Sequence, residues 1–298
     1  MKVLVLGGTR FFGIDMVNRL VADGHDVTIA TRGTTPDSFG STVERIVFDH
    51  RDEQSIRSAF SGRHYDAVID KIAYSSNDIR RVAGNIDMDR YIFASTGGVY
   101  PAMHAMIAED EYIPQEHELK WGERDPEHGG FDYDEGKRQA ECAAVKLLPE
   151  KETVMVRLPV IIGEKDYLRR LLFYVDHVMN EKPIYISNPD ARICFMSQQE
   201  AGGFFADILR TDIYGAVNAS SIGTISPYEF ICYTEGLTGK KAVLSEEGDP
   251  APYNGFSSDY SLDLSKAESA GLSFGELGDW IYSLIDFYAD RIASGAEL

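Results

Sequence analysis

Residues 3–13 decide the fold class, and they read VLVLGGTRFFG. The apolar run over 3–6 is typical of a buried strand, and apolar residues at helical spacing follow Gly13 until Asp23-Gly24-His25. A glycine loop between a strand and a helix presents backbone N–H groups and the positive helix end to a phosphate. The stretch therefore predicts a dinucleotide-binding loop rather than a plain turn.

Apolar runs alternate with helical periodicity along the chain, as in βαβ units. Six parallel strands are predicted, at 3–6, 27–30, 45–48, 67–70, 91–94 and 154–158, and a later strand near 215–219 is expected to rejoin them. Apolar stripes predict helices over 137–148 and 201–209, and the capping-box pattern at Ser273-Phe274-Gly275-Glu276 predicts the start of another.

The predicted fold class is α/β, with a Rossmann-type doubly wound parallel sheet and a smaller C-terminal substrate-binding lobe. We assign residues 1–163 and about 192–220 to the nucleotide-binding domain. Residues 164–191 and 221–298 are then assigned to the lobe.

Composition excludes several classes of protein. The 298 residues carry 48 Asp+Glu against 29 Lys+Arg, a net charge of −19, which repels the phosphates of nucleic acids. No window reaches the roughly 20 apolar residues of a membrane span, and the first apolar run is too short for a signal peptide. We expect a cytoplasmic protein with neither a membrane nor a nucleic-acid partner.

The spacing of the cysteines and histidines does not match that of known metal-binding motifs. Cys142, Cys194 and Cys232 are widely separated, and none of the seven histidines has ligand spacing. We therefore expect no disulfide framework and no metal site.

The stretch from Glu109 to Glu135 is strongly acidic. It holds eleven carboxylates against Lys120 and Arg124, which accounts for nine of the nineteen excess negative charges. Such a block is either a solvated surface excursion or a flap beside the active site. The sequence leaves both open.

Tyr133-Asp134-Glu135-Gly136-Lys137 places a phenol and an ammonium four residues apart, which is one face of a helix. The pKa of an unperturbed tyrosine is about 10, roughly three units too high for a base at neutral pH. A nearby ammonium stabilises the phenolate. We therefore expect Lys137 to lower the pKa of Tyr133.

The two motifs together resemble the extended short-chain dehydrogenase/reductase family, also called the NAD-dependent epimerase/dehydratase family. Phe93-Ala94-Ser95-Thr96-Gly97-Gly98-Val99-Tyr100 resembles the end of that family's catalytic strand, which places Thr96 on the catalytic hydroxyl. The resemblance implies that Thr96, Tyr133 and Lys137 form a triad. Tyr133 would exchange a proton with the substrate, Thr96 would orient the substrate oxygen, and Lys137 would bind the nicotinamide ribose while hydride moves.

The same resemblance implies cofactor contacts on the loops that follow the strands. They are Gly7, Thr9, Arg10, Phe11, Phe12, Gly13, Thr31, Arg32, Asp49, His50, Ile72, Ala73, Tyr133, Lys137, Pro159 and Val160. Arg10 replaces the family's middle glycine, and Thr31-Arg32-Gly33 lacks the carboxylate that bonds a ribose 2′-hydroxyl. Two cations without a carboxylate favour NADP, with NAD as the alternative. Asp70 and Lys71 stand where the family has histidine and an apolar residue.

The resemblance narrows the reaction more than the substrate. Dehydratases of the family carry an acid pair where Gly97-Gly98 stand here, so dehydration is disfavoured. Arg192 lies near a position that binds the diphosphate in nucleotide-sugar epimerases, with a plain surface role as the alternative. Glu246-Glu247-Gly248-Asp249 replaces a second such arginine and would repel a diphosphate. Tyr185, Tyr253 and Phe256 could line a substrate cleft or merely pack.

These patterns predict an NAD(P)-dependent oxidoreductase or epimerase acting on a hydroxyl or keto carbon of a sugar or nucleotide-sugar-like substrate. One alternative is a dinucleotide-binding sensor without turnover, which a Tyr133→Phe variant would discriminate. Another is an RNA-binding protein, because the Gly-Gly-Thr-Arg-Phe loop also resembles the chloroplast stem-loop-binding proteins. Many relatives dimerise through the helix of the Tyr-x-x-x-Lys motif, so a homodimer is a further expectation.

Overall fold

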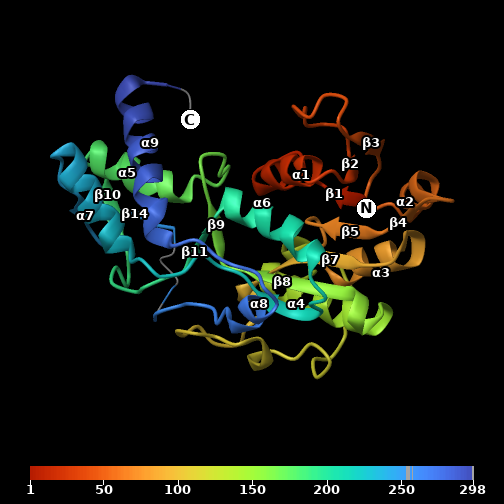
Figure 1. Cartoon of the computed structure of the whole chain (residues 1–298). Helices are drawn as coiled ribbons and strands as arrows, with labels where there is room; N and C mark the ends of the chain where they lie inside the picture. The colour runs from red at the N-terminus through yellow and green to blue at the C-terminus, as the bar shows by residue number, and fades with distance from the viewer. Residues whose placement is uncertain (253–255, 257, 297–298) are drawn as a thin grey trace.

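Seven parallel strands form the central sheet of the computed structural model (Figure 1), which describes residues 1–252, 256 and 258–296 and, of residue 151, only the backbone. Their order is β12-β8-β7-β5-β1-β2-β3. The strands are β1 (Lys2–Leu6), β2 (Asp26–Thr31), β3 (Glu44–Val47), β5 (Ala67–Asp70), β7 (Tyr91–Thr96), β8 (Thr153–Leu158) and β12 (Gly215–Asn218). The six predicted strands and the later one are thus confirmed, and with them the Rossmann-type fold.

Helices cover both faces of this sheet, which explains why β1 is apolar at consecutive positions. Val3 and Val5 belong to one core with α1 and α6, whereas Leu4 and Leu6 belong to the opposite core with α2, α3 and α4. Figure 1 shows α1 and α6 on one side of the sheet and α3 and α4 on the other. These helices are α1 (Phe12–Ala22), α2 (Glu53–Phe60), α3 (Ser76–Asn85), α4 (Tyr133–Leu147) and α6 (Gln198–Asp207).

A separate apolar core lies beyond the sheet, where α5 (Arg170–Met179), α7 (Pro227–Thr238) and α9 (Ile281–Ser294) pack together. The short strands β9 (Val160–Ile162) and β11 (Phe195–Ser197) join the two parts, because each has residues in both cores. The sheet of β10 (Pro183–Tyr185), β13 (Val243–Leu244) and β14 (Asp249–Pro250) lies in the second part, where Ile184 packs in its core. A further two-stranded pair consists of β4 (His64–Tyr65) and β6 (Asp87–Met88). The division into a nucleotide-binding domain and a lobe remains a proposal. Helix α8 (Ser265–Ser269) departs from it, since Ala267 packs in the sheet core.

The capping-box prediction at Ser273 is wrong. The last helix begins at Ile281, after a 3-10 turn over Leu277–Asp279. Ile222 holds the preceding stretch in extended form, because its N–H donates to Gly275 O (2.8 Å) and its carbonyl accepts from Leu277 N (2.8 Å). The apolar residues at helical spacing after the capping-box pattern are nevertheless buried, namely Leu277 in the turn and Ile281, Leu284, Ile285 and Tyr288 in the helix.

The acidic stretch is anchored rather than simply solvated. The Arg157 guanidinium donates to the carbonyl oxygens of Glu109 (2.8 Å) and Tyr112 (2.9 Å), and Arg81 pairs with Glu123 (2.8 Å). Beyond Glu123 the chain turns toward the carboxyl ends of the strands, where Arg124 lines a cavity. The stretch is thus held against the protein at Glu109, Tyr112 and Glu123, and it reaches the cavity at Arg124.

No helix in the described part of the chain combines the length and the apolar character needed to cross a membrane.

Candidate active site

The glycine loop after β1 adopts a conformation that depends on its glycines. Gly7 and Gly8 have φ values of 98° and 99°, in the region that side chains disfavour. A Cβ on Gly13 would lie 2.9 Å from the Gly8 Cα, so α1 starts directly against the loop. The glycines thus let neighbouring protein atoms pack closely against the loop, and Gly7, Gly8 and Thr9 line a cavity beside it.

One cavity of about 320 Å³ lies beside this loop, at the carboxyl ends of β1, β2 and β5. Its lining includes Arg10, Arg32, Lys71 and His50, and no carboxylate is among the described residues that line it. The Nε of Arg10 donates to the Thr35 hydroxyl (3.1 Å). The cavity therefore suits an anionic group.

A larger cavity of about 740 Å³ continues from the first, and Lys71, Tyr74 and Tyr167 line both. The predicted triad lines the larger one: Thr96 at the end of β7, and Tyr133 and Lys137 in the first two turns of α4. Thr96 and Lys137 lie 41 positions apart in the sequence. The fold brings them into one cavity, at the end of β7 and the start of α4.

Local contacts fix the start of α4. The Asp132 carboxylate accepts the N–H of Glu135 (2.8 Å), which is an N-cap bond. Gly136 lies against the Tyr74 carbonyl oxygen and leaves no room for a Cβ. The Tyr133 and Tyr74 rings consequently lie close, with centroids 6.1 Å apart.

Lys137 is buried between two strand ends. Its ammonium donates to the carbonyl oxygens of Ala73 (2.7 Å) and Ala94 (2.6 Å), and it lies 4.4 Å from the Tyr74 ring centroid. Burial lowers the pKa of Lys137 to about 8, although Asp70, Asp78 and Glu141 act in the opposite direction.

The expectation that Lys137 lowers the pKa of Tyr133 is not met. Partial burial raises this pKa above its ordinary value, although the residue is still 41% exposed, while a hydrogen bond with Thr96 and the charge of Arg124 act the other way. Lys137 Nζ is 6.0 Å from the Tyr133 ring centroid and already bonds two carbonyls. In this structure the Tyr133 phenol is therefore protonated at neutral pH.

Two further side chains enter the larger cavity over Gly97-Gly98. A Cβ on Gly97 would overlap the Tyr260 hydroxyl, and one on Gly98 would overlap the Asp134 carboxylate. Both groups line the cavity. Gly97 and Gly98 stand where dehydratases of the family carry an acid pair. Here Gly98 leaves room for the carboxylate of Asp134, which comes from α4.

Most of the predicted cofactor residues line one of the two cavities: Gly7, Thr9, Arg10, Phe11, Phe12, Thr31, Arg32, His50, Ile72, Tyr133, Lys137, Pro159 and Val160. Gly13 lies under the loop, and Ala73 contributes a carbonyl to Lys137. Asp49 lines neither cavity, and its carboxylate accepts the N–H of Arg51 (3.0 Å).

Arg192 also lies apart from the triad. It pairs with Glu229 (2.8 Å) and donates to the Thr224 carbonyl oxygen, and it lines neither cavity. Of the aromatic candidates, Phe256 lines the larger cavity, Tyr185 does not, and Tyr253 falls outside the described residues. The surface interpretation of Arg192 is thus the one that its contacts support.

Sequence reasoning missed several cavity residues, among them Lys71, Tyr74, Arg124, Asp134, Tyr167 and Tyr260. Lys71 and Asp134 had a signal, because each adjoins a motif. Tyr167 and Tyr260 had none, since they come from segments remote in sequence. Among the described residues, one group could hold a metal ion, His64, Asp66 and Asp89, and it lines neither cavity.

Comparisons with known proteins agree with this architecture. Residues 3–188 match the model of the NAD dependent epimerase/dehydratase family. The UDP-glucose 4-epimerase of Thermotoga maritima, solved with UDP-glucose, is similar over 100% of both chains, with 14% identity and a TM-score of 0.72. The UDP-glucuronic acid 4-epimerase of Bacillus cereus, solved with NAD, is similar over 98% of this chain and 99% of that one, with 16% identity and a TM-score of 0.69.

A curated relative is the chloroplast stem-loop binding protein of 41 kDa b of Arabidopsis thaliana. It is 29% identical over 113 residues, which cover 33% of this chain and 30% of that protein. The match thus spans less than a third of the relative's length. The two solved structures, at their low identity, establish the fold.

Proposed function

This chain belongs to the NAD-dependent epimerase/dehydratase family, and on that premise we propose an NADP-preferring oxidoreductase or epimerase. Its substrate is a sugar or nucleotide-sugar-like molecule that reacts at a hydroxyl or keto carbon. The observation that carries the proposal is the meeting of Thr96, Tyr133 and Lys137 in one cavity that continues into the glycine-loop cavity. Turnover rather than mere sensing is favoured because all three triad members are present.

Each cofactor part has a group to hold it. The glycine loop takes the diphosphate, Arg10 and Arg32 the adenosine 2′-phosphate, and Lys137 the nicotinamide ribose. Pro159 follows β8 and Val160 begins β9, and both line the larger cavity, where their backbone would hold the carboxamide. The bound nicotinamide supplies a hydride donor or acceptor.

The substrate oxygen lies between Thr96 and Tyr133 in this proposal. The Thr96 hydroxyl holds the oxygen, and the Tyr133 phenol gives a proton to a keto group or takes one from a hydroxyl. The phenol is protonated at neutral pH and can give its proton to a keto group, and its raised pKa means that accepting a proton from a hydroxyl requires a higher pH. Proton removal in the oxidative direction then speeds up as the pH rises.

Cofactor preference is tested by titrating the protein with NADPH and with NADH, followed by calorimetry. We expect NADPH to bind at least about tenfold more tightly, because a charge-assisted hydrogen bond contributes on the order of 1.5–3 kcal/mol. Arg32→Gln should weaken NADPH and leave NADH unchanged. Tighter binding of NADH would contradict the NADP preference.

Catalysis is tested with Tyr133→Phe, which removes the proton donor and keeps the ring. Reduction of a panel of keto sugars and nucleotide sugars, followed at the nicotinamide absorbance, should slow by roughly 10²–10⁴-fold. NADPH affinity should stay within a few fold, and Tyr214→Phe, an exposed tyrosine outside both cavities, is the matched control. Unchanged turnover would exclude the triad assignment, whereas cofactor binding without any turnover would favour the sensor.

RNA binding is the second candidate, because the stem-loop binding protein of Arabidopsis thaliana is similar over 113 residues. The net charge of −19 opposes it. A gel-shift titration with a stem-loop RNA at low salt should show no complex. A shift that weakens steeply with salt would support this candidate instead.

A further inference from the structure

Lys71 occupies an unusual place in the glycine-loop cavity. It follows β5, and its ammonium donates to the Arg10 carbonyl oxygen (2.8 Å) and lies 4.4 Å from the Phe12 ring centroid. A Cβ on Gly13 would meet Lys71 Nζ at 2.9 Å, and one on Gly7 would meet its Cγ at 2.9 Å. The side chain therefore crosses the loop through the space that the glycines leave open.

The surroundings of this ammonium lack negative charge. Among the described residues, no carboxylate pairs with it, and Arg10 is the charged side chain that acts on it. Burial and Arg10 together lower the pKa of Lys71 to about 8. The positive end of α1 lies beside it, and a helix N-terminus disfavours a cation. The backbone carbonyl and the ring compensate only part of this cost.

Lys71 lies where the two cavities meet. Three described residues line both cavities, Lys71, Tyr74 and Tyr167, and Lys71 is the cation among them. A dinucleotide with its adenosine in the smaller cavity and its nicotinamide in the larger must cross at these residues. The diphosphate is the part of the cofactor that joins the two nucleosides.

We propose that Lys71 binds the cofactor diphosphate, as a chain-specific cation added to the backbone groups of the glycine loop. The inference rests on the proposed function, because it needs a dinucleotide in these cavities. It adds a residue that the family resemblance does not supply, since an apolar side chain is usual there. The excess positive charge around Lys71 is then neutralised when the cofactor binds.

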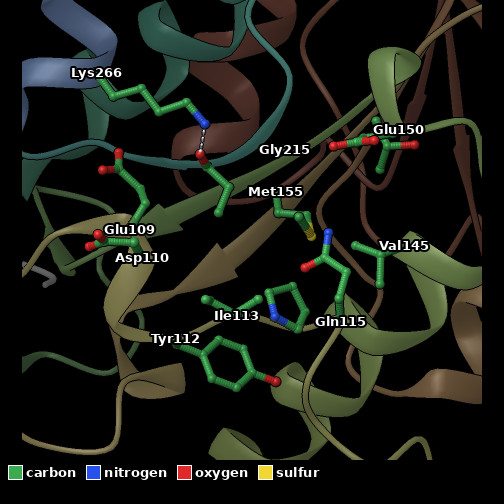
Figure 2. Close-up of a pocket in the computed structure, with 13 residues that line it drawn as sticks. Glu109, Asp110, Tyr112, Ile113, Gln115, Val145, Glu150, Met155, Gly215 and Lys266 are labelled. Atoms are coloured by element: carbon green, nitrogen blue, oxygen red, sulfur yellow. Dashed lines mark hydrogen bonds between the residues drawn. The ribbon is translucent and has the colours of Figure 1, made fainter.

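The test compares Lys71→Met, Lys71→Arg and a control, Lys266→Met. Lys266 is another lysine that bonds two backbone carbonyls, those of Tyr214 (3.0 Å) and Ala216 (2.5 Å), at the edge of β12. It lines the pocket of Figure 2, which shares no described lining residue with the two cavities of the active site. Each variant is titrated with NADPH and with adenosine 2′-monophosphate, which has no diphosphate. Thermal melting of each variant verifies folding.

We expect Lys71→Met to weaken NADPH by roughly ten- to hundredfold and to leave adenosine 2′-monophosphate within about twofold. Lys71→Arg should retain most of the NADPH affinity, and Lys266→Met should match the wild type. Unchanged or tighter NADPH binding by Lys71→Met would overturn the proposal, because the lysine would then be neutral or an obstacle. An equal loss for both ligands would also overturn it.

A wild-type protein that binds neither NADPH nor NADH is a different result. That outcome contradicts the proposed function itself. If the wild type binds NADPH and Lys71→Met binds it equally well, the proposed role of Lys71 is contradicted while the proposed function stands.

Discussion

Position 97 requires glycine because a side chain distant in the sequence packs against it. The Tyr260 hydroxyl fills the space of the missing Cβ, and Tyr260 is only 2% exposed, so it has little room to move. Its neighbour Gly98 gives the same space to Asp134. The glycine pair is thus a packing requirement as well as a departure from the dehydratase pattern.

Gly97→Ala should lower the free energy of unfolding by about 1–3 kcal/mol, because overpacking forces buried groups to shift. Urea unfolding followed by circular dichroism measures it. Tyr260→Phe removes the nearest atom, so Gly97→Ala should cost less in that background. Gly203→Ala, in α6 with open space around it, is the control and should be neutral or stabilising. An equal cost in both backgrounds would refute the packing argument.

Two lysines give cofactor binding a pH dependence. Burial lowers the pKa of Lys71 and of Lys137 to about 8 each; Arg10 acts on the first, and Asp70, Asp78 and Glu141 act on the second. An anionic ligand favours the charged lysine, so above the free-protein pKa a proton must be taken up on binding. NADPH affinity should therefore decline above about pH 8. Dissociation constants from about pH 7 to about pH 9.5 measure this, and an equally steep decline in Lys71→Met would remove Lys71 from the explanation.

Helix α4 links the catalytic residues to the core of the protein. Its first turn carries Tyr133, its second Lys137, and one turn further on Glu141 forms a fully buried ion pair with Arg157 (2.7 Å). Ser95 of β7 donates to the same carboxylate (2.6 Å). The four-residue spacing therefore aligns a site residue and a structural anchor on one face of the helix.

Glu141→Gln should destabilise the protein by about 3–5 kcal/mol, because it leaves the Arg157 guanidinium buried without its counter-ion. Chemical unfolding measures the loss. Glu53→Gln breaks the exposed pair with Arg57 and should change stability by less than about 1 kcal/mol. If both substitutions cost equally little, the buried pair does not anchor α4.

At the scale of the molecule, the acidic stretch covers α4, the helix through which a homodimer was expected. No residue of α4 from Glu135 to Val145 is exposed in the described structure. The Gln139 side chain bonds backbone groups of Glu118 (3.0 Å) and Lys120 (2.6 Å), so the stretch lies directly on this helix. A dimer built on α4 would have to displace it.

We therefore predict a monomer in place of the expected homodimer. Light scattering coupled to size-exclusion chromatography should give a mass near 33.2 kDa at micromolar concentration. A stable dimer whose contacts include α4 would show that the acidic stretch moves away from the helix. Hydrogen exchange over residues 112–123, compared at low and high protein concentration, distinguishes that dimer from one formed elsewhere.

The sequence alone determined the parallel sheet, the glycine loop and the placement of Tyr133 and Lys137 in successive turns of one helix, because periodicity and short spacing are local properties. The tertiary structure decided what depends on burial and on distant segments. It raised the pKa of Tyr133, placed Lys71 across the loop, and put Tyr260 over Gly97. The last helix begins only at Ile281, because the backbone hydrogen bonds of Gly275 and Leu277 with Ile222 outweigh the local capping pattern at Ser273.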